Sequence, residues 1–255
     1  MKDLYDLETL YVDTTKKILH SLSQGEKDGI EGGAICPFVA QVGKNYENSL
    51  YRLMFIGKAT NGWFPYLNCN ETDDEIDSIY KNKCFNPSFA ERLVHRDDEM
   101  QWVEDLEGNE DKDGYNTNKS AFWRVIKKVS SNLEGSDNWS SKIVWSNLYK
   151  FAPDGGNPEG NLAYYQAENC WKILDEEISY FKPKCVIFLT SHMEEEYLAS
   201  RYKNVERKNS SFDGYEISYF IHEGTLFICS LHPQGKPEAS HVKVLTDIIT
   251  SNVNV

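Results

Sequence analysis

A histidine able to exchange or donate a proton directly follows a short apolar run near the end of the chain. His232 comes after Thr225–Leu231 and precedes Pro233, whose ring fixes the backbone, so we expect the imidazole to project from a rigid edge. Histidine titrates near neutral pH and is suited to acid–base chemistry or to hydrogen bonding with a leaving group. The alternative is a histidine that only caps the strand end.

Amide and ammonium groups lie at the ends of two other apolar runs. Asn147 carries a donor and an acceptor that could satisfy backbone groups or pair with the edge of a pyrimidine. Lys58 and Asn61 lie between Gly57 and Gly62, in a turn whose backbone can approach a ligand closely. The alternative is a tight turn with exposed polar side chains.

Aromatic residues flank these turns. Helical spacing makes Phe122 a core residue, whereas Trp63, Phe64 and Tyr115 are better candidates for stacking on a planar ligand.

Five runs predict the strands that position these residues. Four are nearly continuous in apolar residues, as in strands covered on both faces. The fifth, Tyr215–His222, alternates polar and apolar residues and joins Thr225–Leu231 through a turn at Glu223-Gly224. The predicted strands are Tyr51–Gly57, Lys142–Leu148, Lys184–Thr190, Tyr215–His222 and Thr225–Leu231.

Apolar residues spaced three and four apart predict helices near both termini and over about 122–133 and 171–181. Strands that alternate with helices predict an α/β fold: a three-layer α/β/α sandwich with a central, mainly parallel four-stranded sheet plus a C-terminal hairpin strand. Ligands of such folds bind beyond the carboxyl ends of the strands, where the candidate residues lie.

The 255 residues suffice for one large domain, and we expect a single domain over 1–255 with an acidic insertion at about 67–113. This insertion has 15 acidic and 5 basic residues, so it supplies −10 of the net charge of −13. The remainder is close to neutral and could present a basic face to DNA. The alternatives for the insertion are a solvated loop or an interaction segment.

No apolar run is long enough for a membrane span, and the N-terminal residues lack the pattern of a secretory signal. We therefore expect a cytoplasmic monomer that does not contact membranes. The six cysteines have no zinc-site spacing, and Cys185 and Cys229 lie in apolar runs that predict burial. We expect no metal, no disulfide framework and no cofactor.

Four segments, in order, resemble motifs of the uracil-DNA glycosylase superfamily. The turn Gly57–Gly62 resembles its first motif, and His232–Gly235 resembles its last. Residues Asn118–Ile126 are similar to the N-x-F-W-x-x-I helix of mismatch-specific and thymine-DNA glycosylases, and Ser146–Pro158 to a segment of the thermophile-type branch. The resemblance covers the chain from about Arg52 to the C-terminus, apart from the acidic insertion.

The resemblance implies a DNA glycosylase that flips a uracil-like or C5-modified pyrimidine out of the DNA and hydrolyses its N-glycosidic bond, in DNA repair or in defence against modified phage DNA. His232 would donate to the departing base, Asn147 would contact its edge, and Asn61 or Lys58 would position water or phosphate. The substrate-binding residues implied are Asn147, Tyr115, Phe64, Trp63, Gly57, Ala59 and Thr60, and the DNA-binding residues are Lys150, Gln234, Gly235 and Lys236.

The chain departs from the family pattern at several positions. Ala59 occupies a slot that is acidic or an amide in several branches, Thr60 replaces a proline, and Gln234 replaces a serine. Phe151 stands where the iron–sulfur branch has cysteine, so we expect no cluster. The alternative function is a catalytically silent domain that binds nucleic acid or a protein partner. A small-nucleotide hydrolase lacks support, because neither a G-x-S-x-G elbow nor a phosphate-binding loop occurs.

Overall fold

The structure is a computed structural model that describes residues 4–24, 34–68, 70–85, 98–111, 114–153 and 155–254. It divides into two compact units, and each consists of three separate segments. Unit 1 comprises Met1–Ala40, Lys58–Arg96 and Ser146–Lys182; unit 2 comprises Gln41–Gly57, Asp97–Trp145 and Pro183–Val255. The single domain expected over 1–255 stays a prediction.

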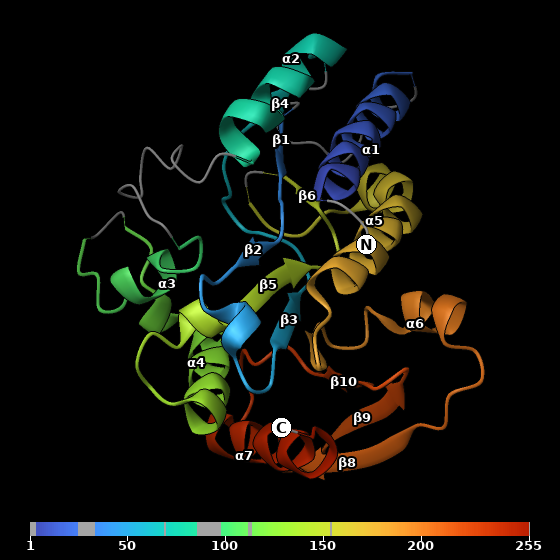
Figure 1. Cartoon of the computed structure of the whole chain (residues 1–255). Coiled ribbons are helices and arrows are strands. Elements are labelled where there is room, and N and C mark those ends of the chain that lie inside the picture. The colour runs from blue at the N-terminus through green and yellow to red at the C-terminus, as the bar shows by residue number, and fades with distance from the viewer. Residues whose placement is uncertain are drawn as a thin grey trace. The chain divides into compact units, whose positions relative to one another are not determined.

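Unit 2 contains the main sheet, which has seven strands among the described residues (Figure 1). All four runs expected in the sheet core form strands and the alternating run forms a fifth, which confirms the α/β class. The sheet order is β2 (Gln41–Val42), β5 (Ile143–Asn147, whose first three residues belong to unit 2), β3 (Leu53–Gly57), β7 (Cys185–Leu189), β10 (Thr225–Ser230), β9 (Tyr215–His222) and β8 (Lys208–Phe212).

The centre of this sheet is parallel. Strand β7 pairs in parallel with β3 on one side and β10 on the other, and all three strands are almost wholly buried. The sheet exceeds the expected one by the edge strands β2 and β8. Strand β2 is only two residues long and β8 has the polar sequence KNSSF, so neither has an apolar run to indicate it.

The predicted hairpin turn joins β9 to β10. His222 is in register with Thr225, which leaves Glu223 and Gly224 as the two-residue loop. Both loop residues have positive φ, at 48° and 83°, as a type I′ turn requires. Gly224 adopts this conformation without strain, whereas Glu223 does so at a steric cost.

Two longer helices of unit 2 pack side by side, α4 (Ala121–Glu134) and α7 (Glu238–Asn252). The Ser120 side chain accepts a hydrogen bond from the Trp123 backbone and caps the start of α4. The Glu238 carboxylate joins the helices by accepting from Arg124 Nε at 2.8 Å and Lys128 Nζ at 2.5 Å. Two short α-helices also lie in the described part of this unit, α3 (Trp102–Asp105) and α6 (Glu195–Arg201).

Among its described residues, unit 1 contains a small antiparallel sheet and three α-helices. In the sheet, β1 (Ala34–Pro37) pairs with β4 (Leu67–Asn68) and β6 (Phe151–Ala152). Helix α1 (Leu4–Gln24) lies beside α5 (Gly160–Phe181) and also contacts α2 (Asp73–Ile79) (Figure 1). The helices predicted near the N-terminus and over about 171–181 are confirmed, and α5 begins earlier than expected. None of the helices in the described part of the chain has the length and apolarity to cross a bilayer.

The acidic segment 67–113 contains core residues. The alternative that it is only a solvated loop is therefore wrong. In unit 1 the side chains of Leu67, Ile76 and Tyr80 are buried, and in unit 2 those of Trp102 and Val103 are buried. The acidic side chains hid this contribution, because Ile76 is a single buried residue on a helix of sequence DDEIDSI. Removing 67–113 would therefore remove parts of both cores.

Candidate functional site

Two predicted site segments leave the same edge of the sheet in unit 2. Ile56 of β3 and Cys229 of β10 are both in register with Phe188 of β7. All three strands run in parallel, so Gly57 and the loop that begins after Ser230 emerge at one carboxyl edge. The expectation that the glycine turn and His232 begin at the same edge is met within this unit.

The His232 ring is held in a defined state by its own loop. Its Nδ1 accepts a hydrogen bond from the Gln234 backbone at 3.3 Å, so in the neutral ring the proton resides on Nε2. The ring stacks on Phe122 with a centroid distance of 6.0 Å and an interplanar angle of 15°. The His232 backbone donates to Ser191 Oγ at 2.8 Å, which joins the loop after β10 to the loop after β7. A neutral imidazole held in this way can donate a hydrogen bond from Nε2.

The residues after His232 form the exposed part of this loop. Gln234 and Gly235 are exposed, and Gly235 has a φ of 73° that favours glycine. Lys236 is half-buried, and its Nζ lies 5.1 Å from the centroid of the Tyr215 ring. The three residues expected to contact DNA after the last motif are thus accessible.

In unit 1, the loop after β3 is bonded to the loop after β5. The Tyr149 backbone donates to the Lys58 carbonyl at 2.9 Å, and the Gly156 backbone donates to Asn61 Oδ1 at 2.7 Å. Two sequence motifs far apart along the chain therefore meet. The Asn61 carbonyl oxygen already holds Gly156, so Asn61 fastens the two loops together and is a weaker candidate for positioning water.

Asn147 supplies a buried donor at the end of β5. Its side chain is 1% exposed, and its Nδ2 finds no acceptor among the residues that the structure describes. A buried donor without a partner is costly, so this amide is available for a ligand acceptor. Thr60 of the neighbouring loop is also buried, and Ala59 is half-buried. Neither side chain has a carboxylate, so the first motif offers none at these two positions.

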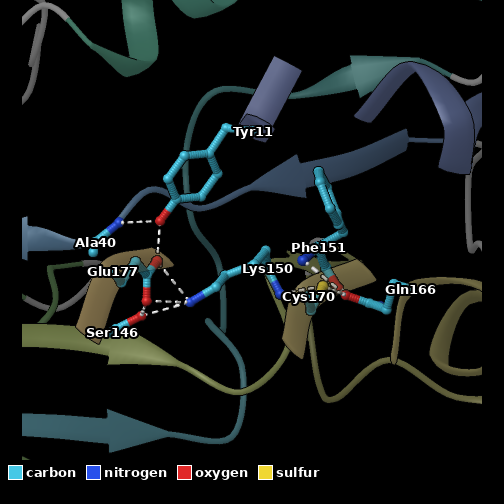
Figure 2. A network of polar contacts seen from close by, with 8 residues as sticks. All are labelled: Tyr11, Ala40, Ser146, Lys150, Phe151, Gln166, Cys170 and Glu177. Carbon is cyan, nitrogen blue, oxygen red and sulfur yellow. Dashed lines mark hydrogen bonds and ion pairs between the residues drawn. The ribbon is translucent and has the colours of Figure 1, made fainter. Parts of the chain in front are cut away.

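Lys150 lies far from solvent, which argues against its expected contact with DNA. Its side chain is fully buried, and its Nζ lies 2.8 Å from Glu177 of α5 and 2.6 Å from Ser146 Oγ (Figure 2). Ser146 in turn donates to Glu177 at 2.6 Å. These partners bind the ammonium group inside the protein, so the prediction that Lys150 contacts DNA is wrong.

The polar network around Glu177 extends to the N-terminal helix. Figure 2 shows the Tyr11 hydroxyl between the Glu177 carboxylate, to which it donates, and the Ala40 backbone, from which it accepts at 3.0 Å. Burial, reinforced by the neighbouring carboxylate, raises the pKa of Tyr11 well above its usual value. Tyr11 therefore stays a neutral donor, and the network joins α1, α5 and the segment after β5.

A second set of contacts fixes the chain beside Lys150. The Lys150 backbone donates to Cys170 Sγ at 3.4 Å, while Gln166 pairs with both backbone groups of Phe151 at 3.0 and 2.9 Å (Figure 2). Burial raises the pKa of the Cys170 thiol to about 12, so the thiol is unreactive at neutral pH. Cys185 and Cys229 are buried as expected.

The aromatic candidates differ in accessibility. In unit 1, Trp63 packs edge-on against Phe38 at 5.5 Å, whereas Phe64 is 42% exposed. In unit 2, Tyr115 is 51% exposed and lies 6.4 Å from Trp102. Phe64 and Tyr115 are therefore accessible for stacking, while Trp63 has a packing role.

Two residues that support the site were not singled out from the sequence. Ser191 holds the His232 backbone, but a serine after a strand gives no distinctive signal. Glu177 had a usable one: it shares the apolar face of α5 with Leu174 and Phe181, at spacings of three and four. A carboxylate on a buried face implies a buried cationic partner.

Compared with models of protein families and with curated proteins, the chain matches none.

Proposed function

We propose that the chain is a DNA glycosylase that excises a uracil-like or C5-modified pyrimidine, with His232 as the donor to the departing base. The observation that carries the proposal is the hydrogen bond from the Gln234 backbone to His232 Nδ1, which puts the proton of the neutral ring on Nε2, the atom that would donate to the base. The proposal includes helices on both faces of the sheet, as in the resembled family, and a monomeric, cytoplasmic protein.

The chemistry that we propose is hydrolysis. The bond between sugar C1′ and the base nitrogen breaks, the base leaves with the electron pair, and a water oxygen bonds to C1′. Negative charge develops on the base carbonyl oxygen, where a positioned Nε2–H donor stabilises it. One donor of this kind contributes about 10²–10³ in rate. The departing base takes up a proton and the water loses one, so the reaction needs no other reactant.

Recognition of the base is assigned to Asn147. Its buried Nδ2 lacks an acceptor among the described residues and can donate to a pyrimidine carbonyl. Phe64 and Tyr115 are the candidates for stacking, and Lys58, Gln234 and Lys236 for contacts with the DNA backbone or groove.

The first experiment offers the full chain duplex and single-stranded oligonucleotides that contain uracil, mismatched thymine or C5-modified cytosines. Hot alkali then cleaves any abasic site. We expect strand cleavage with at least one substrate and a rate lowered about 10²–10³-fold in His232→Ala. His20→Ala changes an exposed histidine on α1 and is the matched control. An absence of abasic sites with every substrate would refute catalysis.

A double-mutant cycle tests whether the effects of Asn147 and His232 on excision are coupled. Asn147→Ala and His232→Ala are compared singly and together on the best substrate. If the loss of rate in the double variant differs from the sum of the two single losses, in free-energy terms, the two residues act together in excision. If the losses add, the two residues act independently.

A catalytically silent DNA-binding domain is the second candidate function. The half-buried Ala59 favours it, because this slot has no group able to activate water. Binding of the same oligonucleotides without excision, unchanged by His232→Ala, would favour the silent domain over the enzyme.

A further inference from the structure

A cluster of three ligating side chains lies where β7 leads into α6, in unit 2. His192, Glu194 and Glu195 each offer one nitrogen or oxygen atom, and these atoms lie within 4.8 Å of one another. His192 is exposed, Glu195 is half-buried and Glu194 is fully buried. Two consecutive residues with positive φ, Ser191 at 56° and His192 at 69°, precede the carboxylates.

Glu194 has a carboxylate that its surroundings satisfy only in part. Its Oε2 accepts a hydrogen bond from the Thr190 hydroxyl, but its Oε1 is buried and has no hydrogen-bond partner among the described residues. A buried carboxylate with an unmatched oxygen is stabilised either by a proton or by a cation.

The neighbouring residues match the supporting groups found around metal ligands. Arg207 Nη1 donates to both Glu195 oxygens, at 3.0 and 2.7 Å, and so orients that carboxylate. Ligating carboxylates are commonly held by such outer hydrogen bonds. The exposed His192 leaves a route by which an ion could enter from solvent.

We propose that His192, Glu194 and Glu195 bind one first-row divalent cation of the zinc type. One imidazole nitrogen with two carboxylates suits such an ion, whereas Mg²⁺ and Ca²⁺ favour sets made entirely of oxygen. Three protein ligands leave a position for water or substrate, as in open zinc sites. The proposal does not depend on glycosylase activity.

The test is calorimetric titration of the chelator-treated, full chain with ZnCl₂. We expect one Zn²⁺ per chain, with affinity lowered at least tenfold in Glu194→Gln and in His192→Ala. Glu196→Gln makes the same change at an exposed carboxylate of α6 and should bind as the unaltered chain does. Far-UV circular dichroism checks that each variant is folded. Because His192 is exposed, its variant keeps the test valid if Glu194→Gln fails to fold.

Two further measurements complete the test. X-ray absorption of the zinc-loaded chain should show nitrogen and oxygen ligands at about 2.0–2.2 Å. Parallel titrations with MgCl₂ and CaCl₂ should give much weaker binding. Unchanged affinity in both variants, absence of zinc binding, sulfur ligands at about 2.3 Å, or tighter binding of Mg²⁺ than of Zn²⁺ would each overturn the proposal. The last two results would indicate a cysteine site or an oxygen-selective site.

Discussion

The ammonium of Lys150 lies 2.8 Å from the carboxylate of Glu177, and neither side chain is exposed to solvent. Burial makes the attraction strong but also makes it costly for either charge to lose its partner. Lys150 follows Asn147 by three residues, so this pair also anchors the segment that carries the proposed base-contacting amide.

Removing one member of this pair should destabilise the protein. We expect Lys150→Met to lower the free energy of unfolding by about 3–5 kcal/mol, because Glu177 keeps a buried charge without its cation. Removing both charges, in Lys150→Met with Glu177→Gln, should cost less than the sum of the single changes. Urea unfolding followed by circular dichroism measures all three variants.

An exposed ion pair on α5, the helix that contains Glu177, provides the control. Lys172 and Glu168 lie 3.3 Å apart with both side chains more than half exposed. Lys172→Met should change stability by no more than about 0.5 kcal/mol. An equally small effect of Lys150→Met would show that the buried pair does not stabilise the fold.

The tautomer of His232 can be measured directly. We expect NMR of the neutral ring to show Nε2 protonated and Nδ1 unprotonated, because the Gln234 backbone donates to Nδ1. Gln234→Pro removes that donor and should produce a mixture of tautomers. Predominant Nδ1 protonation in the unaltered chain would contradict the proposed donor role.

Acid should weaken unit 2 through His241. Burial, with a smaller effect from Lys236, lowers the pKa of His241 from 6.5 to about 4. The unfolded chain therefore takes up a proton before the folded chain does, so the stability present above pH 6.5 is lost as the pH falls toward 4.

Between pH 7 and pH 5 this histidine should account for a loss of about 2 kcal/mol, taking 1.36 kcal/mol per pKa unit. His241→Gln should be less sensitive to pH by that amount in urea unfolding. The carboxylates present in both chains contribute equally to the two pH curves, so their contribution cancels when the unaltered chain is compared with the variant. Parallel pH curves would refute the assignment.

Lys236 should affect DNA binding through its charge. If it contacts a phosphate, Lys236→Ala makes the slope of log Kobs against log salt concentration less steep by about 1. Lys203→Ala changes an exposed lysine of the same unit and is the control. Fluorescence anisotropy with a labelled duplex measures both slopes. Equal slopes for Lys236→Ala and Lys203→Ala would show that Lys236 does not contact a phosphate.

The β9–β10 turn offers a stabilising substitution. Glu223 has a φ of 48°, a conformation that asparagine tolerates better, and Asn-Gly is a favoured type I′ pair. We expect Glu223→Asn to raise the free energy of unfolding by about 0.5–1 kcal/mol. Glu216→Asn, at an exposed position within β9, should not stabilise. A loss of stability in Glu223→Asn would contradict the turn geometry.

The sequence predicted the main sheet well where the pattern was local. Alternation over Tyr215–His222 and the Glu223-Gly224 turn indicated β9 with its bounds, and apolar runs indicated the strands beside it. Strands β1, β4 and β6 were not predicted, because they are two to four residues long and depend on pairing with distant segments.

The candidate site was predictable only in part for the same reason. The neighbouring loops that contain Lys58 and Tyr149 follow predicted strands, so their proximity was expected. Lys150 looked like a surface lysine because its partner is 27 residues away on α5. His192, Glu194 and Glu195 were overlooked because no metal-binding motif has their spacing, and the sequence does not reveal the left-handed backbone at Ser191 and His192.

The alternation of segments between the two units has a practical consequence. The chain passes from one unit to the other five times, at residues 40–41, 57–58, 96–97, 145–146 and 182–183. No single truncation therefore yields either unit intact, and a shortened chain that fails to fold says nothing about which unit is stable. Each unit has to be studied within the whole polypeptide, or by recombining fragments cut at those junctions.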